Sequence, residues 1–201
     1  QTLTYEDELK YKKELIEKLF KDHGIERELK IIPSPVHKFY RNKMEYTFGD
    51  EYKDGPLALG LHVKNRFHEI VNTTECNIVD ADFNKIRSEV RNYFEKIGEK
   101  HYNRKTHEGF LRHLLIRKAT KTSEIMVLLA TSTQSELDRD AFIKFLLDLD
   151  LEGQILSIFH VKNDALSDAI VPEEINLIYG KDHIEEEVLG LKFKISPFSF
   201  F

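Results

Sequence analysis

Short stretches in which apolar and polar residues alternate, joined by tight turns, constrain the fold of this 201-residue chain more than any other feature. Met44, Tyr46 and Phe48 alternate with polar residues, the loop GDEYKDGP follows, and the alternation resumes at residues 57–63. Successive side chains of a strand point to opposite faces of a sheet, so this pattern predicts an antiparallel hairpin with one buried face. A third strand is expected at residues 68–72.

The rest of the chain contains further stretches with the periodicity of helices or strands. Helices are expected where apolar residues recur every three or four positions, and strands where short apolar runs stand between turns. The expected helices are residues 4–23, 80–97 and 138–149, and the expected strands are residues 111–119, 124–131, 154–161 and a last pair, 174–179 and 187–195, turned by GKDH. Because tight turns rather than helical crossovers join the strand pairs, the predicted fold is α+β, with a mostly antiparallel sheet and flanking helices.

Composition places the chain among ordinary globular proteins, with 41% hydrophobic and 32% charged residues. No apolar run approaches the length that spans a bilayer, and no signal-peptide pattern opens the chain. Cys76 is the single cysteine of the sequence, which excludes an internal disulfide framework and fits a reducing compartment. We therefore expect a cytoplasmic protein that does not associate with membranes.

Charge is distributed unevenly along the chain, although the net charge is only −5. Residues 100–121 contain seven Lys or Arg and one acidic residue, whereas residues 134–187 contain fourteen Asp or Glu and four Lys or Arg. Such a separation is typical of a protein with one surface that meets a polyanion and another that stays solvated. Two alternatives stay open: both segments are merely solvated, or the acidic segment binds another protein.

The stretch HKFYRNKMEYTFG is the strongest candidate for a binding surface. Tyr40, Arg41 and Lys43 combine an aromatic ring with two fixed positive charges at the start of a predicted strand, and alternation places Arg41 and Lys43 on one side of it. Basic side chains that hold phosphates, beside an aromatic ring that stacks on a base, are typical of single-stranded RNA binding. The alternative is a strand whose polar side is basic without binding RNA.

The motifs of common enzymes are missing from the sequence. It contains no G-x-G-x-x-G, no Walker loop, no G-x-S-x-G and no H-E-x-x-H. Cys76 lies where a strand is expected to give way to a helix, but iron and zinc sites usually use three or four Cys or His ligands, and a second cysteine is lacking. From the residues alone, Cys76 is expected to be a buried, inert thiol.

Four blocks of sequence, in the same order, resemble the RNA (uracil-5-)-methyltransferase family. They are YRNKMEYTFG, LALGLHVKNRFHEIVNTTECNIVD, HLLIRKATKTSEIMVLLAT and IYGKDHIEEEVLGLKFKISPFSFF, and the similarity extends from the first helix to the last residue. The resemblance implies an enzyme that transfers a methyl group from S-adenosylmethionine to C5 of a uridine in RNA. The bacterial 23S ribosomal RNA members look most similar, which implies 23S rRNA as the substrate, with transfer RNA as the alternative.

The resemblance also implies a division into domains. Residues 1–24 would be a helix that packs on a catalytic domain outside this chain, residues 25–190 a central α+β domain that binds RNA, and residues 191–201 the start of the S-adenosylmethionine-dependent domain. That Rossmann-like domain would hold the nucleophilic cysteine and the base, both beyond Phe201. The chain is therefore expected to be a central fragment that is inactive alone, and the alternative is a stand-alone RNA-binding module without catalysis.

Site residues that match the family complete the prediction. Cys76 matches the fourth ligand of an iron–sulfur cluster, whose three other cysteines lie upstream in the family. Phe200 matches an aromatic residue that packs near the flipped target base. Contacts with RNA are expected from Tyr40, Arg41, Lys43, Arg112, Arg117 and Phe200, whereas Asn42 stands where some relatives have a further arginine. The full-length protein is expected to be a monomer.

Overall fold

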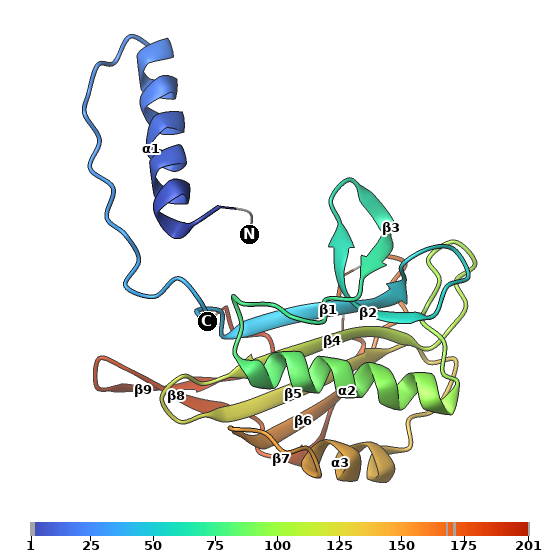
Figure 1. Ribbon diagram of the computed structural model, residues 1–201. Coiled ribbons are helices and arrows are strands. Elements are labelled where there is room, and N and C mark those ends of the chain that lie inside the picture. The colour runs from blue at the N-terminus through green and yellow to red at the C-terminus, as the bar shows by residue number, and fades with distance from the viewer. Residues whose placement is uncertain (1–2, 168, 171, 201) are drawn as a thin grey trace. The chain divides into compact units, whose positions relative to one another are not determined.

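The computed structural model describes residues 3–167, 169–170 and 172–200, so Phe201 lies outside the described residues. The chain forms two compact units, Gln1–Tyr40 and Arg41–Phe201. The first unit consists of one helix and an extended segment, and the second contains a large sheet with helices packed on it (Figure 1).

In the first unit, α1 (Tyr5–Asp22) confirms the predicted N-terminal helix. Thr4 caps this helix, because its side-chain oxygen accepts a hydrogen bond from the Asp7 N–H at 3.2 Å. The extended segment that follows returns alongside the helix, where the ring of His37 stacks on Tyr5 with a centroid distance of 4.6 Å. No residue of α1 is buried, and its packing on a further domain stays a prediction.

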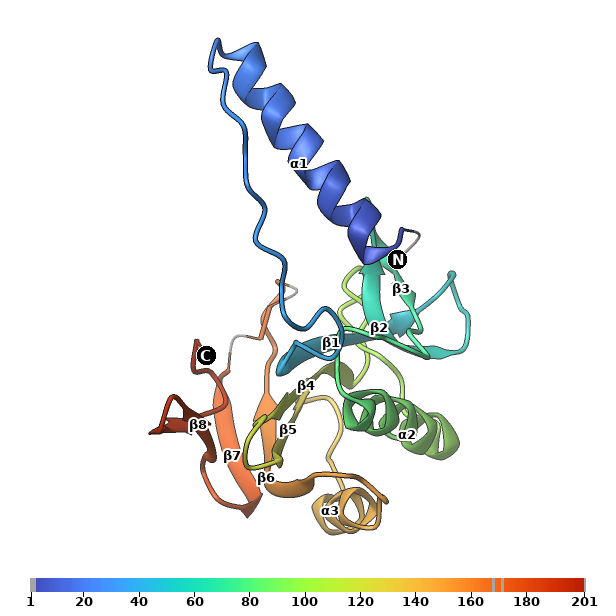
Figure 2. The same cartoon turned by 60° about the vertical axis from the view of Figure 1, so that its left-hand side comes forward.

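The second unit is built on a seven-stranded sheet with the strand order β3-β2-β1-β4-β5-β6-β7. Its strands are β1 (Lys43–Asp50), β2 (Leu57–Val63), β3 (Arg66–Val71), β4 (Leu111–Lys118), β5 (Glu124–Thr131), β6 (Gln154–Lys162) and β7 (Glu174–Gly180). All neighbouring strands are antiparallel except β5 and β6, which are parallel. Helices α2 (Ala81–Ile97) and α3 (Arg139–Leu147) pack on one face of the sheet (Figure 2). The predicted α+β class, with a mostly antiparallel sheet and flanking helices, is confirmed.

One expectation about the connections is wrong, because α3 is a helical crossover between β5 and β6. Tight turns alone were expected between paired strands. When two consecutive strands pair in parallel, the chain must return from the end of the first strand to the level of its start before the second strand begins. A helix packed on the sheet makes that return. None of the helices in the described part of the chain has the length and hydropathy of a bilayer-spanning segment.

The expected pairing of residues 174–179 with 187–195 is also wrong. β7 pairs with β6, and a separate hairpin forms from β8 (Ile184–Val188) and β9 (Leu191–Ile195). Its turn lies at Leu189 and Gly190, whose φ angles are +52° and +79°. Gly190 is a common turn residue, but leucine is unusual at a left-handed position, so this pair is a weak turn signal. The domain boundary expected between residues 190 and 191 falls inside this hairpin.

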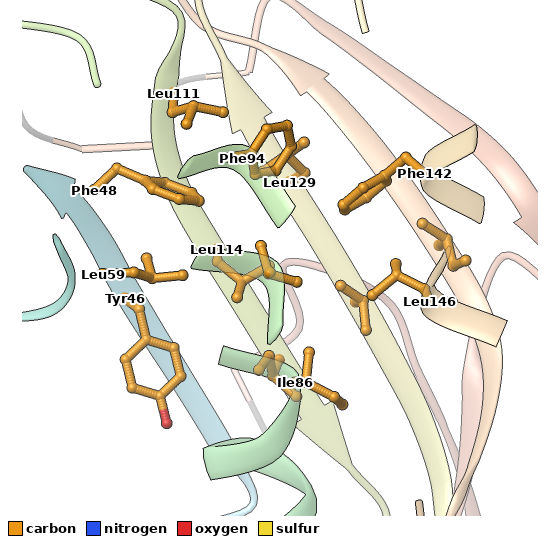
Figure 3. Close-up of a cluster of buried hydrophobic side chains, with 14 of the residues drawn as sticks. Tyr46, Phe48, Leu59, Ile86, Phe94, Leu111, Leu114, Leu129, Phe142 and Leu146 are labelled. Atoms are coloured by element: carbon orange, nitrogen blue, oxygen red, sulfur yellow. The ribbon is translucent and has the colours of Figure 1, made fainter. Parts of the chain in front are cut away.

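The main hydrophobic core lies between the sheet and its two helices (Figure 3). Phe48 of β1 meets Phe94 of α2 edge to face, with ring centroids 5.9 Å apart, and Phe142 of α3 lies 5.6 Å from Phe94. All three rings are buried. Rings of this size contribute most of the burial energy in a core, so this aromatic cluster ties both helices to the strands.

The β8–β9 hairpin covers part of the opposite face of the sheet. Ile184 and Ile195 pack there on a second buried cluster that includes Leu115, Met126, Leu128 and Phe159. Glu186 of β8 is also buried, and its carboxylate accepts hydrogen bonds from the backbone N–H groups of Thr120 and Lys121 in the turn between β4 and β5. A buried carboxylate needs such donors, so Glu186 fixes the hairpin to that turn.

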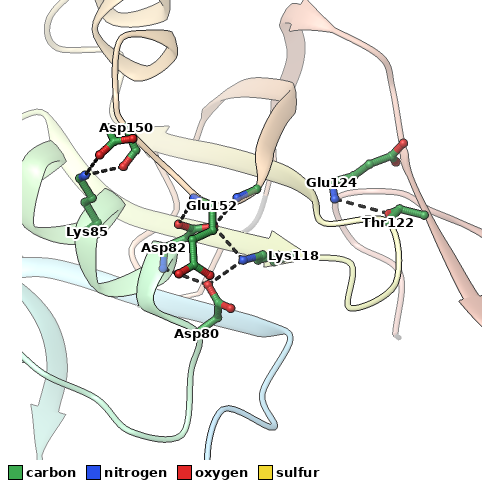
Figure 4. A network of polar contacts seen from close by, with 9 residues as sticks. Asp80, Asp82, Lys85, Lys118, Thr122, Glu124, Asp150 and Glu152 are labelled. Atoms are coloured by element: carbon green, nitrogen blue, oxygen red, sulfur yellow. Dashed lines mark hydrogen bonds and ion pairs between the residues drawn. The ribbon is translucent and has the colours of Figure 1, made fainter.

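A buried ion network joins α2, β4 and the loop that precedes β6 (Figure 4). Lys118 Nζ lies 2.8 Å from carboxylate oxygens of both Asp80 and Asp82. The Asp82 carboxylate also accepts the backbone N–H groups of Glu152 and Gly153 at 2.9 and 2.8 Å. Burial alone would raise the pKa of Asp82, but Lys118 and these donors outweigh it, so that pKa is lowered.

Candidate nucleic-acid interface

Arg41 and Lys43 stand at the beginning of the second unit. The Arg41 N–H donates a hydrogen bond to the Ile78 carbonyl at 2.9 Å, and Arg41 forms a bridge with Val79, so the loop before α2 fixes its backbone. The Arg41 side chain is exposed and that of Lys43 is half-buried, whereas Met44 is buried in the core. The two basic residues are therefore held at the accessible start of β1, where phosphate contacts are sterically allowed.

The two aromatic residues expected to contact RNA are both exposed. Tyr40, the last residue of the first unit, is 57% exposed, and Phe200 in the second unit is fully exposed. An exposed ring can stack on an unpaired base of any kind, because every base has a π-face. The contact of these rings with RNA stays a prediction.

Arg117 is buried and anchors the C-terminal segment. It lies opposite Lys43 in the β1–β4 pair, and its guanidinium group donates to the Pro197 carbonyl at 3.2 Å and to the Ser199 carbonyl. Burial lowers the pKa of Arg117, yet guanidinium groups stay charged at any physiological pH. Arg117 therefore holds the segment that carries Phe200 beside the strand that begins at Lys43.

Arg112 is also buried, at the other end of β4. It donates to the Asn163 and Ser167 carbonyls at 2.8 Å, and its guanidinium group lies 4.3 Å from the centre of the Tyr102 ring. Both Arg112 and Arg117 are therefore engaged with backbone carbonyls of the protein itself. A sequence cannot distinguish a guanidinium group that binds phosphate from one that binds backbone carbonyls. Contact of Arg112 or Arg117 with RNA stays a prediction.

Cys76 lies in the loop between β3 and α2, half-buried against the core. Asn84 of α2 braces it twice, because the Asn84 side-chain oxygen accepts the Cys76 N–H and its amide donates to the Cys76 carbonyl, both at 3.1 Å. Among the described residues, no three His, Cys, Asp or Glu side chains are grouped to hold a metal ion. A cluster would need its other ligands from elsewhere, and the role of Cys76 as a ligand stays a prediction.

Sequence reasoning missed a cavity of about 350 Å³ in the second unit. Its walls include two loops, residues 50–54 from the end of β1 and residues 101–105 before β4, together with Glu69 and Ile70 of β3, and Thr47 and His113 line it between the loops. Each loop contains a tyrosine next to or near a basic residue, in the stretches DEYKD and HYNRK, although the first is mainly acidic, which is a weak signal for nucleotide binding. Nothing in the sequence shows that the two loops meet, because the β1–β4 pairing that joins them is long-range.

Comparison with known proteins identifies relatives along the whole chain. It is 44% identical over 203 residues to a protein of Caldanaerobacter subterraneus subsp. tengcongensis described as an uncharacterized RNA methyltransferase, covering 100% of the chain and 45% of the relative. A second protein with that description, from Clostridium acetobutylicum, is 46% identical, again over the whole chain and 44% of the relative. The chain thus spans less than half the length of these relatives. No family model matches it.

A solved structure with a similar fold is likewise named as an RNA methyltransferase. The crystal structure of the Pyrococcus abyssi tRNA (uracil-54, C5)-methyltransferase, in complex with S-adenosyl-L-homocysteine, matches 99% of this chain and 45% of its own, with a TM-score of 0.74 and 25% identity. The chain is thus similar in sequence to proteins described as RNA methyltransferases and similar in fold to a tRNA (uracil-54, C5)-methyltransferase. The predicted resemblance to the RNA (uracil-5-)-methyltransferases is confirmed.

Proposed function

We propose that this chain is the central part of an enzyme that transfers a methyl group from S-adenosylmethionine to C5 of a uridine in RNA, and that its own role is to position the RNA. The observation that carries the proposal is the match of 99% of the chain, at a TM-score of 0.74, to a tRNA (uracil-54, C5)-methyltransferase. That structure holds S-adenosyl-L-homocysteine, the product that S-adenosylmethionine leaves after methyl transfer, which supports S-adenosylmethionine as the donor.

The start of β1 and the C-terminal segment would form the RNA-contacting surface. Arg41 and Lys43 supply positive charge for phosphates, and Phe200, on the segment that Arg117 anchors, supplies a ring for the flipped uridine. Flipping a base costs a few kcal/mol, and stacking on a ring offsets part of that cost. This arrangement would present the uridine without reacting with it.

The chemistry itself would belong to residues outside this chain. Methylation at C5 requires a thiolate that adds to C6 and a base that then removes the C5 proton. In this proposal both lie in a Rossmann-like domain that follows Phe201, residues 191–201 lead into that domain, and α1 packs on it. The same domain would bind S-adenosylmethionine. The protein acts in the cytoplasm as a monomer.

Cys76 would be one of four thiolate ligands of an iron–sulfur cluster. Support comes from its position on a braced loop, since the two hydrogen bonds with Asn84 fix the backbone from which the thiol projects. Such bracing fits a ligand that must meet others at a set distance. The three other cysteines would come from the segment that precedes α1 in the longer protein, and the cluster would join the two segments structurally.

The substrate has two candidates. Ribosomal RNA is proposed because the sequence blocks look most like the bacterial 23S rRNA enzymes. Transfer RNA is the second candidate, because the solved structure that matches is named for uracil 54 of tRNA. The test is to delete the gene that encodes this chain in its native host and to measure 5-methyluridine in purified 23S rRNA and tRNA by mass spectrometry. Loss from one RNA identifies the substrate, and unchanged levels in both would reject the methyltransferase assignment.

RNA binding by the chain itself is tested by salt dependence. We expect the double substitution Arg41→Glu and Lys43→Glu to weaken filter binding to 23S rRNA fragments and to lower the slope of log K against log salt by roughly 1.4, for two lost contacts with single-stranded RNA. Lys96→Glu, at an exposed position of α2, is the matched control. Equal weakening by the control, or an unchanged slope in the double variant, would contradict the role of these two residues.

A further inference from the structure

The cavity between the loops 50–54 and 101–105 lies on the sheet face opposite α2. Phe48 and Leu114 point into the core beneath α2, so their strand neighbours Thr47 and His113, which line the cavity, point to the other face. Its volume of about 350 Å³ falls at the small end of the range for ligand pockets, roughly 300–1,000 Å³. A pocket of this size is suited to a single nucleotide rather than to a large cofactor.

Local hydrogen bonds fix the first wall of the pocket. The Asp54 N–H donates to the Asp50 carboxylate at 3.1 Å, and the Gly55 N–H donates to the Tyr52 carbonyl at 2.8 Å. A Cβ on Gly55 would lie 2.8 Å from the Tyr52 carbonyl oxygen and 3.2 Å from its ring, so this tight turn favours a glycine. Tyr52 is 63% exposed, and its outer face is accessible at the rim of the pocket.

The second wall is fixed in the same way. The Asn103 N–H donates to the Glu108 carbonyl at 2.7 Å, and the Asn103 side-chain oxygen accepts the Lys105 N–H at 2.8 Å. Tyr102 is nearly buried in this wall, with the Arg112 guanidinium group 4.3 Å from its ring centre. Both walls therefore keep their shape without a ligand, which lowers the entropy lost on binding.

The charges around the pocket are mixed, and this restricts the ligand. The lining includes the cations Lys53, Arg104, Lys105 and Arg112 and the carboxylates Asp50, Asp54 and Glu69, and Lys53 and Lys105 are exposed at the rim. Because positive and negative groups are interspersed, the lining offers no site of a single sign for a ligand with several negative charges, such as a nucleoside triphosphate. A nucleotide within an RNA strand carries one charge per phosphate, and carboxylates accept hydrogen bonds from the amino group of a base such as cytosine.

His101 adds a neutral hydrogen-bonding group to the pocket. Burial lowers the pKa of its imidazole, although the charge of Asp50 acts in the opposite direction. A neutral imidazole has one donor and one acceptor nitrogen, which suits the edge of a base better than a phosphate. The pocket thus combines an exposed ring for stacking, polar groups for a base edge and lysines for the flanking phosphates.

We propose that this pocket receives one unstacked base of the RNA, a base that bears an exocyclic amino group, while Lys53 and Lys105 contact the neighbouring phosphates. This inference rests on the proposed function only in taking RNA as the ligand. It adds a second recognition point, separate from the surface at Arg41 and Lys43, and it selects for adenine, cytosine or guanine rather than for the uracil that would be methylated.

The test uses the 201-residue chain and fluorescein-labelled hexanucleotides of cytidine, adenosine and uridine, with binding followed by anisotropy at low salt. We expect the cytidine and adenosine strands to bind more tightly than the uridine strand. Tyr52→Ala should weaken their binding by roughly fivefold to 150-fold, because base–aromatic stacking contributes about 1–3 kcal/mol. Tyr179→Ala, at a partly exposed position of β7, is the matched control and should have no effect. Asp50→Asn should reduce the preference over uridine.

Amide chemical shifts of the labelled chain locate the binding. Changes confined to residues 50–54 and 101–105 on addition of the cytidine strand support the pocket, and changes elsewhere alone overturn it. Binding that Tyr52→Ala leaves unchanged overturns the pocket but not the RNA-binding role, which the variants at Arg41 and Lys43 test separately. If the folded wild-type chain binds none of the three strands or 23S rRNA fragments, both the pocket and the proposed RNA-binding role fail.

Discussion

His160 should make the stability of the second unit fall over a defined range of acidic pH. It lies in β6 with 1% exposure, and its Nε2 is 2.9 Å from the Thr131 hydroxyl, while Nδ1 has no hydrogen-bond partner among the described residues. Burial lowers the pKa of His160 from 6.5 to about 4, and the positive charges of Arg139 and Lys162 act in the same direction. Glu136 and Glu174 oppose this shift without cancelling it.

The direction of this pH dependence follows from the pH at which the folded and the unfolded states each protonate His160. The unfolded chain protonates this histidine as the pH falls through 6.5, but the folded chain does so only near pH 4. Between these values each pH unit favours unfolding by about 1.4 kcal/mol, so the full loss is roughly 3 kcal/mol. Above pH 6.5 the histidine is neutral in both states and has no effect on the pH dependence.

The assay is chemical denaturation at pH 7.5, 5.5 and 4.5, followed by near-ultraviolet circular dichroism of the packed tyrosines and phenylalanines. His160→Gln can keep a hydrogen bond to Thr131 but does not titrate, so between pH 7.5 and pH 4.5 the variant should lose about 2.5 kcal/mol less than the wild type. His23→Gln, at an exposed position, serves as the control for general effects of the substitution. Parallel stability curves for His160→Gln and the wild type would refute the reasoning.

Two other substitutions test the anchors of the second unit. Lys118→Met should reduce the free energy of unfolding by about 3–5 kcal/mol, because it leaves the buried Asp82 carboxylate without its cation, and a loss below about 1 kcal/mol in urea denaturation would count against that role. Arg117→Met should make amide hydrogen exchange of residues 196–200 at least about tenfold faster, since hydrogen bonds from a charged group contribute about 1.5–3 kcal/mol, while exchange in the core strands stays slow. An unchanged exchange rate in that segment would show that Arg117 does not hold it.

Local sequence patterns were enough to predict the elements whose causes are local. The Thr4 cap, the apolar spacing of α1 and the alternation of β1 and β2 each depend on residues within a few positions of one another. The α2 helix was equally visible, because Asp80 caps it and Gly98 ends it with a left-handed φ of +78°. These signals are chemical properties of single residues, so they need no knowledge of the rest of the fold.

Features that depend on distant contacts could not be predicted. The position of β7 beside β6, instead of beside the strand that follows it in the chain, depends on contacts across the sheet. Burial of Arg112 and Arg117 depends on carbonyl groups 51 to 82 positions further along the chain. The same limit hid the pocket, whose two walls come from loops separated by some fifty residues of sequence.

Arg117 and the turn that follows it bind the C-terminal part of the chain, and these hydrogen bonds have a consequence for how the family can diverge. The carbonyls of residues 197 and 199 and the carboxylate of Glu186 are all bound within residues 117–121. The position of Phe200 is therefore set by β4, in the middle of the sheet. Loops elsewhere could lengthen or shorten during divergence without moving the ring. A single-residue insertion at 117–121 would instead displace the β8–β9 hairpin and Phe200 together. Relatives in which this phenylalanine still functions should therefore have no insertion at 117–121.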